Sequence, residues 1–268
     1  MNIHTEYGFQ FKKLLHLLSL IDSEMYILPD EFGTVLFTAE NRRHKFRMAV
    51  HLDEQFFFTS SLFTYKWKRQ ILLDVFIWLH MLQNVGLKDS VCTSWKEEGI
   101  FEVRVKNIQE NSIQHDLSIT YEIIKKRIKL CNSIQENTCP LVLLATYIIK
   151  SPDTDLKYLP ELYKEMTISI HDSRLTFSAK NEYSQVSIDM QTVLTYNMFK
   201  NQQSSFCNNP FTTNTKLFIE CFTSAMEITA KSHFEVHLFS NEIESNIIHT
   251  LRLQFNMNQK MCFLTLDI

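Results

Sequence analysis

The chain has 268 residues, close to the size at which one hydrophobic core stops growing and folding divides between two domains. Its hydrophobic residues (45%) and charged residues (21%) give the composition of a globular protein, which excludes an intrinsically disordered chain. The formal net charge of -3 excludes a protein that grips nucleic acid with its whole surface, so any DNA contact must be local, loose or topological.

In the first half of the chain, helical and strand patterns alternate. Residues 8–21 predict an amphipathic helix, because apolar side chains recur on one face at i, i+3, i+4 and i+7. These side chains are Phe11, Leu14, Leu15 and Leu18. A second helix is predicted over 73–84, which is apolar nearly all round. Alternating or β-branched runs predict strands at 24–29, 34–39, 45–52, 88–95, 100–107 and 113–123.

The second half of the chain shows the same alternation. A helix is predicted to begin with Ser151 as its N-cap and Pro152 at its first position. It runs to about Glu165, with a kink or an interruption at Pro160. A further helix is predicted over about 215–229. Strands are predicted at 141–149, 166–171, 174–179, 184–190, 234–240, 247–256 and 260–266.

The two halves also resemble each other in sequence. The segment 35–41 (VLFTAEN) resembles 175–181 (LTFSAKN) at an offset of 140, and 24–27 resembles 165–168 at an offset of 141. A repeat with matching order and offset favours duplication of one α+β domain over a chance likeness between two hairpins. We therefore predict domains at 1–124 and 141–268.

Residues 125–140 have little periodicity and are expected to connect the two domains. The connector begins with the basic run Lys125-Lys126-Arg127. This run could be a nuclear localisation signal or an anion contact, and a solvated linker is the alternative.

The cysteines and the N-terminus indicate an intracellular protein. The six cysteines contain no C-x-x-C pair, and the first residues lack the basic-then-apolar order of a secretory signal. The sequence has no run of 18 apolar residues. We therefore expect reduced thiols and a location in the cytosol or the nucleus.

Residues 18–29 (LSLIDSEMYILP) resemble the Rad-nine type subunits of the nine-one-one DNA-damage checkpoint clamp. Further ordered likenesses to this family lie at Gly33, Asn41-Arg42-Arg43, Phe56-Phe57, Tyr65, 71–82, Cys139-Pro140 and 262–266. The resemblance implies an α+β DNA-clamp fold, similar to proliferating cell nuclear antigen. Such a fold has two tandem similar domains, each with two helices packed on antiparallel sheets, joined by a linker.

The same resemblance implies a non-catalytic subunit of a heterotrimeric ring, formed with Rad-one and Hus-one type subunits. A clamp loader would place this ring around double-stranded DNA at damage sites in the nucleus. There it would serve as a platform for checkpoint and repair proteins, and no cofactor is implied. Two departures weaken the match: Ile77 stands where the family has an arginine, and the chain stops at Ile268 where the family continues into a phosphorylatable tail. Either the tail was removed or this is a short form.

The resemblance implies that the helices line the hole of the ring and that partners dock near the linker. The residues expected to face DNA are Lys12, Lys13, His16, Lys157, Lys164 and Lys216. The residues expected to bind partners are Ala39, Arg42, Arg43, Phe46, Ile128 and Leu130. Solvated surfaces are the alternative for the charged residues, and strand core is the alternative for Phe46. Edge strands near 107–123 and 172–190 are candidates for pairing across subunits.

Two other functions are alternatives to this one. A homotrimeric replication clamp would have the same fold, and self-assembly of the chain would distinguish it. A metal-dependent nuclease is disfavoured, since the pairs His115-Asp116 and His171-Asp172 are adjacent on predicted strands and point to opposite faces. H-E-x-x-H, G-x-S-x-G and P-loop spacings do not occur. We therefore expect neither catalytic residues nor a metal site.

Overall fold

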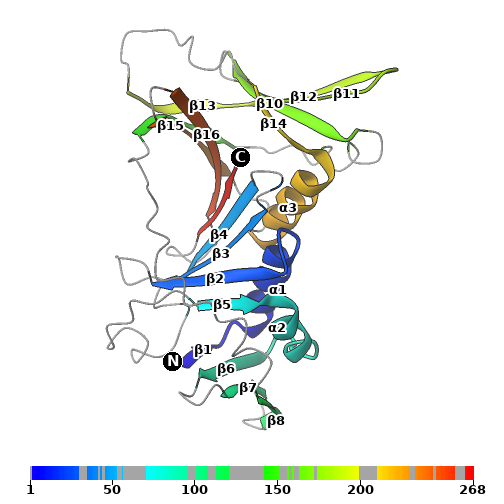
Figure 1. The fold of residues 1–268 in the computed structure, drawn as a ribbon, viewed down its shortest axis with the longest axis vertical. Coiled ribbons are helices and arrows are strands. Elements are labelled where there is room, and N and C mark those ends of the chain that lie inside the picture. The colour runs from blue at the N-terminus through cyan, green and yellow to red at the C-terminus, as the bar shows by residue number, and fades with distance from the viewer. Residues whose placement is uncertain are drawn as a thin grey trace. The chain divides into compact units, whose positions relative to one another are not determined.

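A computed structural model gives the fold of the chain, which divides into two compact units (Figure 1). The first unit comprises Met1–Ala39 and Ala49–Ile134, and the second comprises Glu40–Met48 and Gln135–Ile268. The structure describes residues 2–29, 35–41, 43, 46–52, 56, 71–95, 100–107, 113–120, 142–150, 156, 159, 163–171, 174–198, 210–229, 233–243, 246–256 and 263–268.

The first half of the chain contains two helices and eight strands among these residues. The helices are α1 (Gly8–Ser19) and α2 (Val75–Met81). The strands are β1 (Asn2–Thr5), β2 (Glu24–Pro29), β3 (Val35–Asn41), β4 (Phe46–Leu52), β5 (Ile71–Asp74), β6 (Asp89–Trp95), β7 (Ile100–Asn107) and β8 (Ile113–Thr120). They follow the orders β1-β6-β7-β8 and β4-β3-β2-β5.

Among the described residues, the second half of the chain repeats the strand arrangement with one additional strand and contains one helix. Its described helix is α3 (Thr215–Ile228). Its strands are β9 (Val142–Ile149), β10 (Glu165–His171), β11 (Arg174–Lys180), β12 (Gln185–Gln191), β13 (Val193–Asn197), β14 (Phe211–Asn214), β15 (Phe234–Ile243), β16 (Asn246–Asn256) and β17 (Phe263–Asp267). They follow the orders β12-β11-β10-β14 and β13-β9-β15-β16-β17.

The strand registers of the two halves match residue by residue. Glu24 lies opposite Asp74 across β2 and β5, and Glu165 lies opposite Asn214 across β10 and β14. Each residue of the second pair lies 140 or 141 positions after its equivalent in the first. The offset found in the sequence therefore reflects a real structural duplication.

The strand-to-helix corners before α2 and α3 also match. A carboxylate oxygen of Asp74 accepts hydrogen bonds from the backbone N–H groups of Phe76 (2.9 Å) and Ile77 (3.4 Å). The side-chain oxygen of Asn214 accepts one from the N–H of Leu217 at 2.9 Å. Both side chains thereby satisfy helix N–H groups that have no partner within the first turn.

The buried face of α1 is the one predicted from the sequence. Phe11, Leu14, Leu15 and Leu18 are all buried, in agreement with their spacing. The first position of this helix requires a glycine, Gly8, because the backbone there passes very close to β6. A Cβ atom there would lie 2.5 Å from the backbone oxygen of Asp89.

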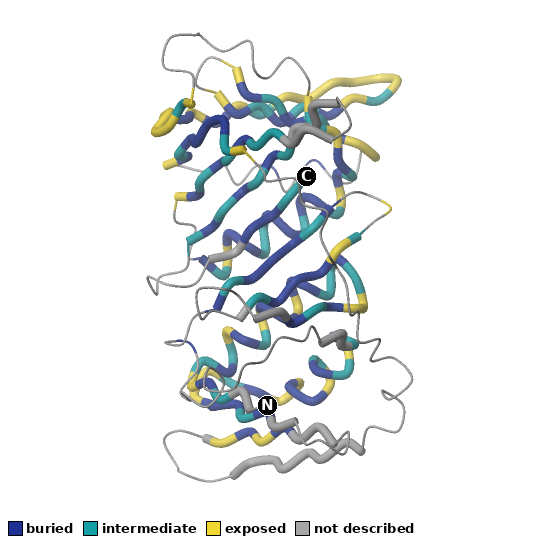
Figure 2. The backbone as a smooth tube through the Cα atoms, turned by 60° about the vertical axis from the view of Figure 1, so that its left-hand side comes forward, coloured by how far each residue is buried: buried dark blue, intermediate teal, exposed yellow. Residues whose placement is uncertain are grey.

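Each unit is built around an aromatic core, and the buried positions run through its helices and strands (Figure 2). In the first unit, Trp78 of α2 lies 5.5 Å from Phe11 and 6.5 Å from Phe37, measured between ring centroids. In the second unit, Phe218 of α3 lies 5.7 Å from Phe177. Phe177 and Phe218 each follow their equivalents, Phe37 and Trp78, by 140 positions.

Some predicted boundaries differ from the structure. The helix predicted over 73–84 begins only at Val75, because Ile71–Asp74 form β5 and pair with β2. Most of the helix predicted over 151–165 lies outside the described residues, and Glu165 already belongs to β10. Four short strands were not predicted: β1, β5, β13 and β14.

Candidate nucleic-acid interface

The helices of the first unit present a cationic surface. Lys13 is exposed, and its Nζ lies 5.0 Å from the ring centroid of Phe9. Lys12 is half-buried, and its Nζ donates a hydrogen bond at 2.5 Å to the backbone oxygen of Gln83, just beyond α2. A cation at this end also stabilises the helix dipole, so Lys12 has a structural role in addition to any contact with DNA.

His16 is exposed on the same helix and interacts with Ser19. Its Nδ1 lies 3.4 Å from Ser19 Oγ, which itself donates to the backbone oxygen of His16 at 2.6 Å. The segments α1 and α2 contain no aspartate or glutamate. These three predicted residues of α1 therefore share one helix that carries no acidic side chain.

The helix of the second unit presents a different surface. Lys216 is exposed, but its Nζ lies 3.9 Å from a carboxylate oxygen of Glu220, one helical turn later. Lys164 is exposed, and its backbone oxygen accepts a hydrogen bond from the N–H of Thr215 at 3.1 Å. Lys157 lies outside the described residues. The positive charge expected on this helix is therefore partly neutralised.

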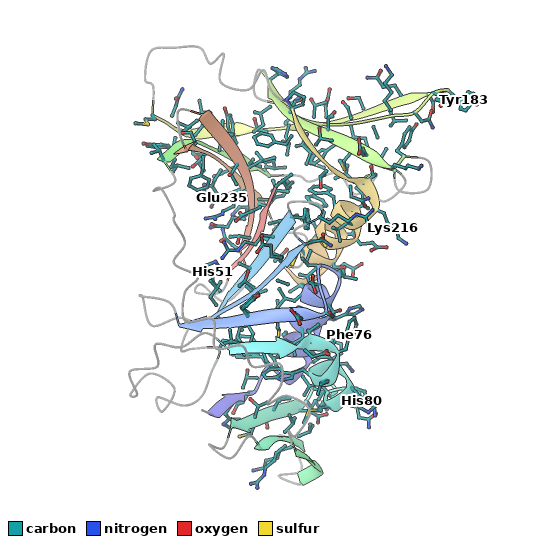
Figure 3. The ribbon with its side chains drawn as sticks, viewed as in Figure 1. His51, Phe76, His80, Tyr183, Lys216 and Glu235 are labelled. Atoms are coloured by element: carbon teal, nitrogen blue, oxygen red, sulfur yellow. The ribbon has the colours of Figure 1, made fainter. Side chains whose placement is uncertain are left out.

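Sequence reasoning missed two exposed residues on α2. Phe76 is 55% exposed, and His80 is exposed one helical turn further on. Figure 3 labels both, together with Lys216 of α3. By the offset of 140, Phe76 is equivalent to Lys216 and His80 to Glu220. The repeat could have identified both as solvent-facing, whereas the apolar pattern of 73–84 could not.

The predicted partner-binding residues differ in burial, and some of them lie outside the described residues. Ala39 and Phe46 are completely buried, and Phe46 packs edge-to-face against Phe218 at 6.5 Å between ring centroids. A partner would not contact these two side chains in this conformation, which favours the core alternative for Phe46. Arg43 is exposed. Arg42, Ile128 and Leu130 lie outside the described residues.

Each of the two ranges predicted to hold edge strands contains a strand at the end of its sheet, but the range 172–190 also contains β11, which lies between β12 and β10. β8 ends the order β1-β6-β7-β8, and β12 ends the order β12-β11-β10-β14. β12 is largely exposed, including Val186 at 36% (Figure 2). In β13 the pairing register with β9 shifts between Leu194 and Tyr196, and such irregularities weaken an edge as a template for pairing. The β7–β8 pairing also shifts its register, between Val105 and Lys106, whereas β12 pairs with β11 without a shift. β12 is therefore the most regular of these three sheet-end strands.

The outer side of the β9-β15-β16-β17 sheet holds a polar cluster. Nδ1 of His237 lies 3.1 Å from Thr146 Oγ1, and its Nε2 lies 3.3 Å from a carboxylate oxygen of Glu235, without the alignment of a hydrogen bond. Arg252 donates to both carboxylate oxygens of Asp267, at 2.6 and 3.0 Å. Burial lowers the pKa of His237, and the nearby Glu235 carboxylate partly opposes this effect. The cluster links neighbouring strands of the sheet.

Neither a metal-binding cluster nor a membrane-spanning helix occurs in the described part of the chain. It contains no group of three or more histidine, cysteine, aspartate or glutamate side chains that could hold a metal ion. It also contains no helix long and apolar enough to cross a membrane.

The arrangement of the whole chain is the sliding-clamp fold. PCNA from Thermococcus kodakaraensis matches with a TM-score of 0.66 and 12% identity, covering 100% of this chain and 98% of that chain. A structure of the PCNA2–PCNA3 complex from Sulfolobus tokodaii matches with a TM-score of 0.68 and the same identity and coverage. No protein-family model matches the sequence, and no curated protein matches it. The predicted α+β clamp fold is therefore confirmed.

Proposed function

We propose that this chain is a non-catalytic subunit of a ring clamp that encircles double-stranded DNA. The observation that carries the proposal is the clamp fold over the full length of the chain, combined with two strands that each end a sheet, β8 and β12. A strand at the end of a sheet offers backbone groups to a neighbouring chain. Two different ends on one chain suit head-to-tail assembly, which closes into a ring.

In such a ring, β8 of one subunit pairs with the strand equivalent to β12 of the next. The two strands have similar lengths, eight and seven residues. The helices α1, α2 and α3 face the DNA. Residues 125–140, which lie outside the described residues, are the proposed connector of the two domains. Because the ring holds DNA by topology, weak and sequence-independent phosphate contacts are sufficient. Lys13 and Lys216 are the exposed lysines of the described helices and supply such contacts.

Within this class, we favour a heterotrimeric checkpoint clamp formed with Rad-one and Hus-one type subunits. The support is the resemblance of residues 18–29 to the Rad-nine type subunits, a stretch that runs from the end of α1 through β2. A clamp loader would place this ring on DNA at damage sites in the nucleus. Checkpoint and repair proteins would then dock on it, with Arg43 and the unplaced Arg42, Ile128 and Leu130 as candidate contacts.

Light scattering after size exclusion tests the assembly. The chain alone is expected at its monomer mass of 31.7 kDa and, mixed with both partner types from the same source, as a one-to-one-to-one complex. A complex of three identical chains, formed without partners, would instead assign the protein to the homotrimeric replication clamps. A monomer that ignores both partners would contradict the checkpoint proposal.

A matched pair of variants tests the role of β12. Val186→Lys places a charge on this edge strand, whereas Val142→Lys places the same charge on β9 at a valine of similar exposure, 41% compared with 36%. Edge lysines oppose strand addition. We expect Val186→Lys to weaken assembly and Val142→Lys to leave it unchanged. Equal assembly of the two variants would remove β12 from the interface.

A further inference from the structure

The starting observation is the pair Phe76 and His80 on the solvent side of α2 (Figure 3). The core of this helix is filled without them, because Val75, Trp78 and Met81 are its buried residues. Only the backbone N–H of Phe76 is used by the Asp74 cap. The two aromatic side chains are therefore free of any role in the buried packing of α2.

A single exposed phenylalanine is ordinary in a folded protein. Here, however, the same site in the second unit carries Lys216 and Glu220, which form an ion pair of the kind expected on a solvated helix. The first unit has replaced this ion pair by a phenyl ring and an imidazole at the same spacing. The phenyl ring and the imidazole offer flat faces on which a ligand with aromatic groups can stack, whereas the ion pair of α3 does not.

The cationic side chains of α1, next to α2, favour a negatively charged ligand. Neither α1 nor α2 contains an aspartate or glutamate within its own span, while α1 carries Lys12, Lys13 and His16. The adjoining acidic side chains are Asp74, which caps α2, and Glu6, just before α1. Lys12 is tied to α2 through its hydrogen bond to the backbone of Gln83, three residues beyond His80. Cationic side chains and exposed aromatic rings are thus combined on one pair of packed helices, and this combination is complementary to a polyanion with aromatic groups.

We propose that the α1–α2 surface binds single-stranded DNA, with Phe76 and His80 stacking on unpaired bases and Lys13 contacting the phosphates. Duplex DNA offers phosphates but keeps its base faces stacked, whereas a single strand exposes a π-face at every base. The inference rests on the proposed function, since it assumes that the helices face DNA. It adds that the first unit recognises unpaired bases, as found beside a gap or a junction, and the second unit does not.

The test measures fluorescence anisotropy of the full chain with a labelled single-stranded oligonucleotide and with a duplex of the same length. Phe76→Leu keeps an apolar side chain and removes the π-face. Tyr183→Leu is the matched control, because Tyr183 is 92% exposed but lies in the turn between β11 and β12. We expect Phe76→Leu to weaken single-strand binding by about five- to one-hundred-and-fifty-fold, the range that corresponds to loss of one base stack. Duplex binding by this variant, and single-strand binding by Tyr183→Leu, should change by less than about twofold.

A second readout separates stacking from a general loss of structure. Fluorescence of 2-aminopurine placed in the single strand is quenched when the base stacks, so it should fall on binding to the wild-type chain and not to Phe76→Leu. An equal loss of single-strand and duplex binding, or quenching that survives in Phe76→Leu, would overturn the inference. Loss of ring assembly in Phe76→Leu, with single-strand binding intact, would overturn it by identifying a protein contact instead. Light scattering on the same samples reports whether the clamp proposal itself has failed.

Discussion

Helices α2 and α3 occupy equivalent places in the two units, but they differ in length, with seven and fourteen residues, and on their outer sides. Both follow a short strand paired in the same register, both are capped by the last residue of that strand, and both bury an aromatic ring at the fourth helical position. On the solvent side, α2 has Phe76 and His80 at the positions where α3 has Lys216 and Glu220. The duplicated fold constrains the buried side and the cap, while the exposed side is available for separate functions.

The largest expected effect is on stability, and it concerns the equivalent core positions of the two helices. Trp78→Ala and Phe218→Ala each remove a fully buried ring from the centre of one unit. We expect each change to lower the free energy of unfolding by about 3–5 kcal/mol, measured by urea denaturation. Phe76→Ala, at the exposed neighbour of this position, should cost less than about 0.5 kcal/mol. A large cost for Phe76→Ala would mean that its ring supports the fold.

The helix caps should show a smaller effect of the same kind. Asp74→Ala and Asn214→Ala should each destabilise by about 1 kcal/mol in the same denaturation experiment. The loss should be greater for Asp74, because its carboxylate accepts from two N–H groups and also carries a charge that the helix N-terminus stabilises. Asp74→Asn is the control that keeps the acceptor and should recover most of the loss. Equal losses in Asp74→Asn and Asp74→Ala would show that the acceptor is unimportant.

The salt dependence of duplex binding sharpens the contrast between the two outer surfaces. Lys13→Gln should reduce the slope of log K against log salt by about 0.9, the contribution of one phosphate contact. Lys216→Gln should reduce it less, because the Glu220 carboxylate already partly neutralises that lysine. Glu220→Gln should increase the slope by releasing Lys216. An unchanged slope in Lys13→Gln would remove this lysine from the DNA contact.

The smallest expected effect is on the dependence of stability on pH. The fourth residue of β6 is Cys92, opposite Arg104, while the fourth residue of β15 is His237, opposite Arg252. Burial lowers the pKa of His237 below its ordinary value of 6.5, so the folded state binds the proton more weakly than the unfolded state. This contribution to stability is complete above pH 6.5 and declines as the pH falls from there toward the lowered pKa.

Replacement of His237 should therefore flatten the pH dependence. Urea midpoints of the wild type should decrease more between about pH 7.5 and pH 5.5 than those of His237→Asn, because the substitution removes a group that titrates in this window. Parallel decreases in both proteins would assign the acid sensitivity to other groups.

The sequence revealed those features that rest on periodicity or repetition. The buried face of α1 followed from its 3.6-residue period, and the duplication followed from the offset of 140. Short strands were not predicted, because four or five residues, as in β5 and β13, are too few to show alternation. The exposure of Phe76 and His80 could not be predicted from the sequence, because α2 is apolar nearly all round. Only the packing of this helix determines which side meets solvent. Conversely, Ala39 and Phe46 were expected at a partner surface but lie in the core.

Electron microscopy of the complex purified with Rad-one and Hus-one type subunits tests the central claim most directly. We expect class averages to show a closed ring of three subunits, each contributing two similar lobes, around an open hole. The same preparation made with Val186→Lys should contain open or partial rings. A compact particle without a hole, or three lobed chains joined in an open array, would contradict the assignment of this protein as a clamp subunit.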